Sequence, residues 1–176
     1  MKFSKLAAER RSGSPVFIAL IILVLFLPCA EAEASEYNVF VIDGFIYETD
    51  IGFFYNYGNY YGENATNIDM FLEGEYIDIY FELFVPNNYD RIIAGTYSLS
   101  NEYPPPPFTF LSGSMVTFDV YYEAYYEVLD GTLEVSVSGT GDDAIFTIAI
   151  NCLVEDDYGD IFRIRGIYRG PLLEDW

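Results

Sequence analysis

The sequence predicts an all-β domain whose antiparallel strands pack as a β-sandwich. Apolar residues recur at every second position over much of the chain, and clusters of Gly, Pro, Asn, Asp and Ser separate the alternating runs. After residue 34, no segment keeps an apolar helical period over three turns. A sandwich is favoured because several strands carry bulky aromatic residues on both faces and the loops differ in length. A lipocalin-like up-and-down β-barrel is the alternative.

The clearest strand lies in residues 75–85, where apolar and polar side chains alternate. One face carries Ile77, Ile79, Phe81, Leu83 and Val85, and the opposite face carries Tyr76, Asp78, Tyr80 and Glu82. This pattern is typical of a half-buried strand. Similar patterns predict strands at 37–42, 45–49, 67–73, 92–99, 108–111, 115–126, 132–138, 143–153 and 161–168.

Turn-forming residues separate the predicted strands. They occur at 86–88, 112–114, 130–131, 139–141 and 158–159. Two further segments are expected to be loops. Residues 53–64 are rich in Tyr, Asn and Gly, and residues 103–107 contain four consecutive prolines, which a central strand does not tolerate.

The first 34 residues have the three-part pattern of a secretory signal peptide. Basic residues at positions 2, 5, 10 and 11 precede an apolar run at 16–27, and alanines follow at 30, 32 and 34. The apolar run is well short of the ~20 residues that a membrane-spanning helix needs. Cleavage after Ala32 or Ala34 competes with lipidation of Cys29, for which Pro28 is a poor fit. We therefore expect a signal peptide at 1–34 and one domain at 35–176, secreted or anchored to the cell envelope as a lipoprotein.

The domain that follows the leader is strongly acidic. The whole chain has 28 acidic and 8 basic residues, a formal net charge of −20, and no His. Both lysines lie in the leader, so the remaining basic residues are Arg91, Arg163, Arg165 and Arg169, which we expect to pair with acids. This charge repels nucleic-acid phosphates and anionic lipid surfaces. We predict no nucleic-acid partner, and membrane contact only through the leader or a lipid anchor.

Most catalytic chemistries lack their residues in this chain. Without His, the usual base for a Ser or Cys nucleophile is missing, and Cys152 falls on the inward face of its strand, which predicts a buried, inert thiol. Carboxylates remain, and a hydrolase with two facing acids is a minor alternative. The acids on outward strand faces, Asp78, Glu82, Asp119 and Glu123, are expected to be solvated. We therefore predict that the protein is not an enzyme.

The densest acidic cluster surrounds the predicted turn at 158–159. Asp156, Asp157 and Asp160 offer hard oxygen ligands that suit Ca²⁺. A hairpin turn with Gly159 at positive φ and acids facing water explains the same residues. Calcium is the one cofactor that the sequence leaves open.

Tyrosines expected at the surface are the best indication of function. The candidate binding residues are Tyr55, Tyr57, Tyr60, Tyr61, Tyr76, Tyr80, Tyr121 and Tyr125. A Tyr side chain combines a flat apolar ring with a hydroxyl, which suits both sugar rings and protein contacts, although cross-strand packing explains such residues as well. We predict a binding or structural protein of the cell envelope that recognises carbohydrate or protein. A lipocalin-like carrier of a small apolar ligand is the alternative.

Four segments resemble a group of uncharacterised secreted proteins and lipoproteins of Bacteroidales-type bacteria. They are AGTYSL at 94–99, FTF at 108–110, DGTLEVS at 130–136 and IRGIYRGPL at 164–172. In that group a Gly-Thr-Tyr strand, a Gly-Thr-x-x-Val-Ser strand and a closing Gly-x-Tyr-x-Gly strand recur in this order. The resemblance covers residues 67–172. It implies an extracytoplasmic antiparallel β domain and assigns no catalytic residue.

Overall fold

The computed structural model describes residues 37–118 and 124–174, which belong to the unit Ser35–Trp176. The predicted signal peptide, Cys29 and Tyr121 lie outside the described residues. Within these ranges the chain forms twelve strands and one short 3-10 turn, so the predicted all-β fold is confirmed. No helix in the same ranges has the length and apolar character needed to cross a membrane.

Most of the strands match predicted ones. The twelve strands are β1 (Val39–Ile42), β2 (Phe45–Glu48), β3 (Ile51–Gly58), β4 (Ala65–Glu73), β5 (Ile77–Pro86), β6 (Gly95–Leu99), β7 (Thr109–Phe110), β8 (Met115–Phe118), β9 (Ala124–Ser138), β10 (Ile145–Asp156), β11 (Ile161–Gly170) and β12 (Leu172–Glu174). Of these, β3 and β12 were not predicted. The 3-10 turn Gly141–Asp143 connects β9 and β10.

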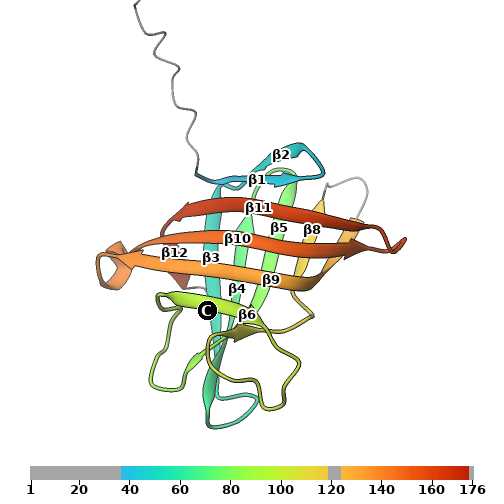
Figure 1. The fold of residues 1–176 in the computed structure, drawn as a ribbon. Helices are drawn as coiled ribbons and strands as arrows, with labels where there is room; N and C mark the ends of the chain where they lie inside the picture. Colours follow the sequence, from blue (N-terminus) through green and yellow to red (C-terminus); the bar gives the residue numbers. More distant parts are fainter. Residues whose placement is uncertain (1–36, 119–123, 175–176) are drawn as a thin grey trace, which may run out of the picture. The chain divides into compact units, whose positions relative to one another are not determined.

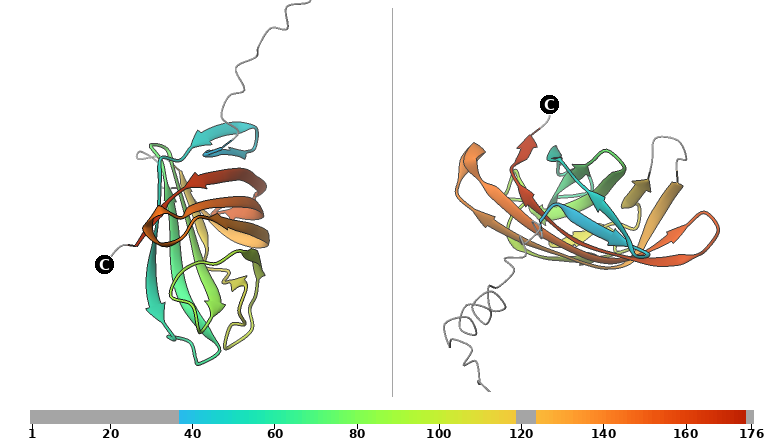
Figure 2. Two further views of the ribbon diagram at one scale, coloured as in Figure 1. Left: turned by 90° about the vertical axis from the view of Figure 1, so that its left-hand side faces the viewer. Right: turned by 90° about the horizontal axis from the view of Figure 1, so that it is seen from above.

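All twelve strands belong to one sheet that folds into two layers (Figure 1). The hydrogen-bonded path runs β12-β3-β4-β5-β7-β6-β9-β10-β11-β1-β2, and β8 pairs with both β5 and β9. One layer contains β12, β3, β4 and β5, and the second contains β6, β9, β10, β11, β1 and β2; Figure 2 shows the layers facing each other. The short strands β7 and β8 join them. Pairing is antiparallel except for β12 with β3 and β6 with β7.

The hydrophobic core lies between the layers and follows the predicted alternation. In β5 and β10 the predicted inward residues are buried: Ile77, Ile79, Phe81, Leu83, Val85, Phe146, Ile148, Ile150 and Cys152. These side chains form one cluster with inward residues of the other strands. Burying a large apolar side chain contributes about 1.5–3 kcal/mol, so this cluster is what holds the layers together. Tyr97 and Tyr168 are also buried, and their hydroxyls donate to backbone carbonyls of Ile93 and Pro171.

Residues 130–131 lie inside β9, directly after a β-bulge at Leu129, and the predicted turn there is wrong. β9 continues through them to Ser138, and its register against β10 shifts between Leu153 and Val154. Gly131 has φ +133°, which residues with a Cβ rarely adopt, and its N–H donates to Oδ1 of Asp130 at 2.7 Å. The Asp-Gly pair therefore marks a distortion inside a strand. β9 pairs with β8 before the bulge and with β6 after it.

Two other segments also differ from the prediction. Residues 115–126 are not one strand, because β8 and the beginning of β9 run antiparallel and pair with each other. Residues 53–64 are not all loop, because β3 extends to Gly58 and pairs with β4. Both faces of β3 carry aromatic residues. Asn56 and Gly58 lie at a register shift near the end of the strand. Val137, expected inside, is 36% exposed.

The proline loop and the turn at 158–159 are confirmed. Residues 103–107 lie in the connection between β6 and β7. In the turn between β10 and β11, Gly159 has φ +84° and its N–H donates to the Asp156 carbonyl at 3.0 Å. Turn chemistry therefore explains the position of these acids without a ligand.

Candidate functional site

The outer side of β3, β4 and β5 carries a row of aromatic rings. Pairing places Phe53 opposite Phe71 and Phe71 opposite Tyr80, all on the side away from the core. The Phe53 and Phe71 rings stack with centroids 5.0 Å apart, and the Tyr80 ring lies 5.0 Å from Phe71. Tyr55 meets Phe53 and Phe71 edge-on at 5.8 and 5.7 Å. We call these four residues the aromatic face. Their side chains are half-buried, so part of each ring remains accessible.

Two carboxylates lie beside the aromatic face, in the next row of the sheet. Asp69 on β4 is directly opposite Glu82 on β5, and Tyr55 on β3 is opposite Asp69. Like charges that face each other across strands destabilise a sheet, so this acid pair is an unfavourable arrangement for folding alone. Asn67 is 3% exposed and its amide Nδ2 donates to Oε1 of Glu82 at 3.1 Å. The buried amide therefore holds one of the two carboxylates in place.

The surroundings of the acid pair raise the pKa of Asp69 to about 6. Burial is the larger cause and the Glu82 charge is the second, while a hydrogen bond from Tyr80 opposes them. Oδ1 of Asp69 is buried and has no hydrogen-bond partner among the described residues. Burial and the same carboxylates also raise the pKa of Tyr80, and burial and Glu82 raise that of Tyr61 to about 12. The two tyrosines therefore keep their protons and act as hydrogen-bond donors to the acids.

Two loops close one end of this surface. Tyr61, in the connection between β3 and β4, packs on Phe84 at 5.4 Å and lies 6.4 Å from Tyr103 in the connection between β6 and β7. Phe84 is on the outer side of β5 but is only 1% exposed, because these loops cover it. Tyr60 contacts Tyr61 edge-on at 5.0 Å and is 75% exposed. Tyr60 and Tyr61 thus form a rim above the acid pair.

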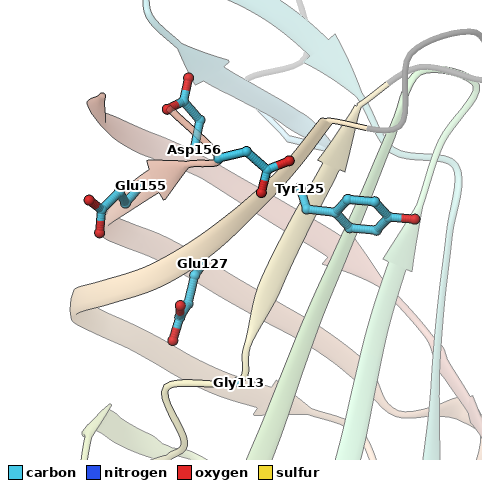
Figure 3. A pocket seen from close by; sticks show the side chains of 6 residues that line it. Gly113, Tyr125, Glu127, Glu155 and Asp156 are labelled. Carbon is cyan, nitrogen blue, oxygen red and sulfur yellow. The ribbon is translucent and has the colours of Figure 1, made fainter. Parts of the chain in front are cut away.

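A second candidate site is an acidic pocket of about 270 Å³ (Figure 3). Its lining residues are Gly113, Tyr125, Glu127, Glu155, Asp156 and Asp157. Figure 3 shows the Tyr125 ring extending to the opposite side from the carboxylates of Glu127 and Glu155. Oδ1 of Asp156 accepts the N–H groups of Tyr158 and Asp160, both at 2.9 Å, so this oxygen holds the turn.

The described residues contain no group of three or more His, Cys, Asp and Glu side chains placed to hold a metal ion. Calcium at Asp156, Asp157 and Asp160 stays a prediction. The acidic pocket contains groups from two of our predictions, Tyr125 and the acidic turn, but its side chains do not converge on one point in Figure 3. The aromatic face with its acid pair is therefore the stronger candidate.

The predicted binding tyrosines among the described residues do not all lie together. Tyr55 and Tyr80 belong to the aromatic face, and Tyr60 and Tyr61 to its rim. Tyr57 and Tyr76 are more than half exposed, near the end of β3 and before β5, and Tyr125 lines the acidic pocket. The structure therefore brings four of these residues together on one surface.

The sequence analysis missed several residues of the site. Phe53, Phe71, Asn67 and Asp69 were not among the candidates, and Glu82 was expected to be an ordinary solvated acid. That expectation for Glu82 is wrong, because it is partly buried, faces another carboxylate and accepts a hydrogen bond from a buried amide. The signal that was available is the alternation of Asn67, Asp69 and Phe71 within their strand.

The remaining predictions concern Cys152 and the arginines. Cys152 is buried as expected, and burial raises the pKa of its thiol to about 12. Within the described residues only Arg91 forms an ion pair, with Asp90 at 3.4 Å. Arg163 instead donates to Oδ1 of Asn151 at 2.7 Å, and Arg169 lies 4.9 Å from the ring centroid of Tyr37. Among the described residues, the expected pairing with an acid is therefore found for Arg91.

No protein-family model, curated protein or solved structure matches this chain. The resemblance to secreted Bacteroidales-type proteins stays a prediction. The geometry of the site itself is the basis for the proposals that follow.

Proposed function

We propose that this chain is an exported, non-enzymatic protein that binds carbohydrate through the aromatic face. The observation that carries the proposal is the aromatic row of Phe53, Phe71 and Tyr80 lying directly beside the row of Tyr55, Asp69 and Glu82. A sugar ring presents apolar C–H groups and hydroxyls close together. Half-exposed rings next to fixed hydrogen-bonding groups complement both features.

The polar groups of the site suit hydroxyl ligands. Glu82 is held by Asn67, and the hydroxyls of Tyr61 and Tyr80 point at carboxylates. Groups that are already oriented lose little conformational freedom when a ligand binds, which favours affinity. The rim formed by Tyr60 and Tyr61 gives the surface one closed end, against which the end of a sugar chain would rest.

The carrier alternative has less support than the surface site. An apolar ligand inside the domain needs space between the layers, but buried side chains such as Tyr97, Tyr168, Phe81 and Phe110 occupy that region. A ligand there would have to displace core packing, which costs several kcal/mol for a large side chain.

Tyr80→Leu is expected to weaken oligosaccharide binding at least tenfold. The change removes one ring of the aromatic row and a hydrogen bond to Asp69 while keeping an apolar side chain on β5. A glycan array identifies an oligosaccharide that binds, and isothermal titration calorimetry then measures the affinity of the variant. The matched control is Tyr158→Leu, at a turn residue that is 92% exposed. An equal loss in both variants, or an array without any binder, would contradict the proposal.

The acid pair also gives specific support to a second candidate, a carboxylate hydrolase. Glycosidases use two facing carboxyl groups, one of which has a raised pKa, and Asp69 opposite Glu82 has that pattern. We expect the bound oligosaccharide to stay intact during prolonged incubation, as measured by mass spectrometry. Cleavage by the natural protein that is absent in Glu82→Gln would contradict the non-enzymatic proposal and support a hydrolase.

A further inference from the structure

The acid pair lacks a positively charged partner in the part of the chain that the structure describes. Arg91 pairs with Asp90, and Arg163, Arg165 and Arg169 lie on β11 in the second layer. The only charged group that acts on Asp69 to shift its protonation is Glu82, which carries the same sign. Partly buried charges are normally paired with an opposite charge or a bound ion. A ligand that brings a positive charge would remove this repulsion.

The acid pair needs a hydrogen-bond donor as well as a positive charge. Oδ1 of Asp69 is buried and has no partner within residues 37–118 and 124–174, and buried polar atoms in folded proteins rarely stay unsatisfied. A primary ammonium group carries three N–H donors and one positive charge. It is able to donate to Asp69 and Glu82 together, which neither a neutral hydroxyl nor a quaternary ammonium group achieves.

The rings around the acid pair favour an organic cation over a metal ion. Phe71 and Tyr80 follow in the next row of the sheet, and Tyr55 lies opposite Asp69. Aromatic rings attract ammonium groups through their faces, whereas Ca²⁺ requires six to eight oxygen ligands. Two carboxylates and one amide supply at most about five oxygens, so Ca²⁺ would need further ligands from water.

We propose that the Asp69–Glu82 pair binds a primary ammonium group of the ligand, so that the aromatic face selects sugars with a free amine. This inference rests on the proposed carbohydrate-binding function and names the class of sugar. An amino sugar places its ammonium group on the acid pair and its ring on the aromatic face. The strongly acidic domain, with the chain's formal net charge of −20, also attracts such cations from solution.

The test compares three oligosaccharides of equal length by isothermal titration calorimetry, at a pH where free amines are protonated. They are a glucosamine oligomer, its N-acetylated form, and its N-trimethylated form, which keeps the charge but has no N–H donors. We expect the glucosamine oligomer to bind at least tenfold more tightly than either of the others. Glu82→Gln and Asp69→Asn should abolish this preference. Glu134→Gln, which removes one exposed charge from β9 in the second layer, should keep it.

A fourth ligand, the simple amine benzylamine, separates failure of the inference from failure of the proposed function. If all three oligomers bind equally, carbohydrate binding stands and the ammonium site is wrong. If no oligomer binds but benzylamine binds to the natural protein and not to Glu82→Gln, the ammonium site stands and the carbohydrate proposal is wrong. If neither the oligomers nor benzylamine bind, both are wrong. Circular dichroism of each variant shows that it is folded before it is compared.

Discussion

Asp69→Asn is expected to stabilise the protein at pH 8 and to have little effect at pH 3. The pKa of Asp69 in the folded protein is about 6, above its ordinary value of 3.8. A raised pKa means that the folded state prefers the protonated acid, so ionisation opposes folding. The group is neutral in both states well below pH 3.8; its unfavourable contribution grows as the pH rises from 3.8 to about 6 and stays constant above that. Asn removes the charge at every pH and supplies an N–H donor toward Glu82.

The expected gain at pH 8 is on the order of 2 kcal/mol. Two pKa units correspond to about 3 kcal/mol, which partial exposure of the site reduces. Urea unfolding at both pH values gives the free energy of unfolding. The control is Glu134→Gln, which removes a charge from an exposed position on the second layer and should change stability little at either pH. Destabilisation at pH 8, or the same gain at both pH values, would contradict the described surroundings of Asp69.

Gly131→Ala is expected to destabilise the protein by about 3 kcal/mol or more. Gly131 has φ +133°, and a Cβ added there would lie 2.5 Å from Cα of Cys152, with a backbone oxygen of β10 closer still. Backbone strain of about 1–2 kcal/mol and overpacking of about 1–3 kcal/mol both oppose folding. Gly131 pairs with Cys152 of β10, two residues after the bulge at Leu129, and β9 pairs with β8 before the bulge and with β6 after it, so the change disturbs a strand with three partners.

The urea midpoint of Gly131→Ala should fall well below that of the natural protein. Gly113→Ala is the matched control, because a Cβ at Gly113 meets no atom within 4 Å. We expect its midpoint to stay within error of the natural value. An unchanged midpoint for Gly131→Ala would contradict the positive φ of Gly131 and its close approach to β10.

The strand pattern could be predicted because burial imposes a period of two on strands with one face in the core. β5 and β10 show this most clearly, since each has one continuous apolar face. The continuation of β9 through Asp130 and Gly131, after the bulge at Leu129, could not be predicted in the same way. An Asp-Gly pair is equally typical of a tight turn, and only the pairing with β10 determines which structure forms. β3 was missed for a similar reason, because its Asn and Gly residues indicate a loop when its partner β4 is not considered.

The candidate site was predicted only in part, because it depends on the register between strands. Tyr80 and Glu82 were correctly placed on the outer side of their strand by alternation alone. Nothing within β5 reveals that Asp69 faces Glu82. The charge of Glu82 is one cause of the raised pKa of Asp69. The register follows from the short turn at Gly74–Tyr76, so the facing pairs Glu73–Asp78 and Asp69–Glu82 could have been derived by pairing residues outward from that turn.

The central claim is that the ligand lies on the aromatic face beside the acid pair. The most direct test is an NMR titration of the ¹⁵N-labelled domain with the glucosamine oligomer, followed through backbone amide shifts. We predict that the largest amide shifts occur in β3, β4 and β5, around Asp69, Phe71, Tyr80 and Glu82. Largest shifts around Tyr125 and Asp156 instead would place the ligand in the acidic pocket and contradict the claim.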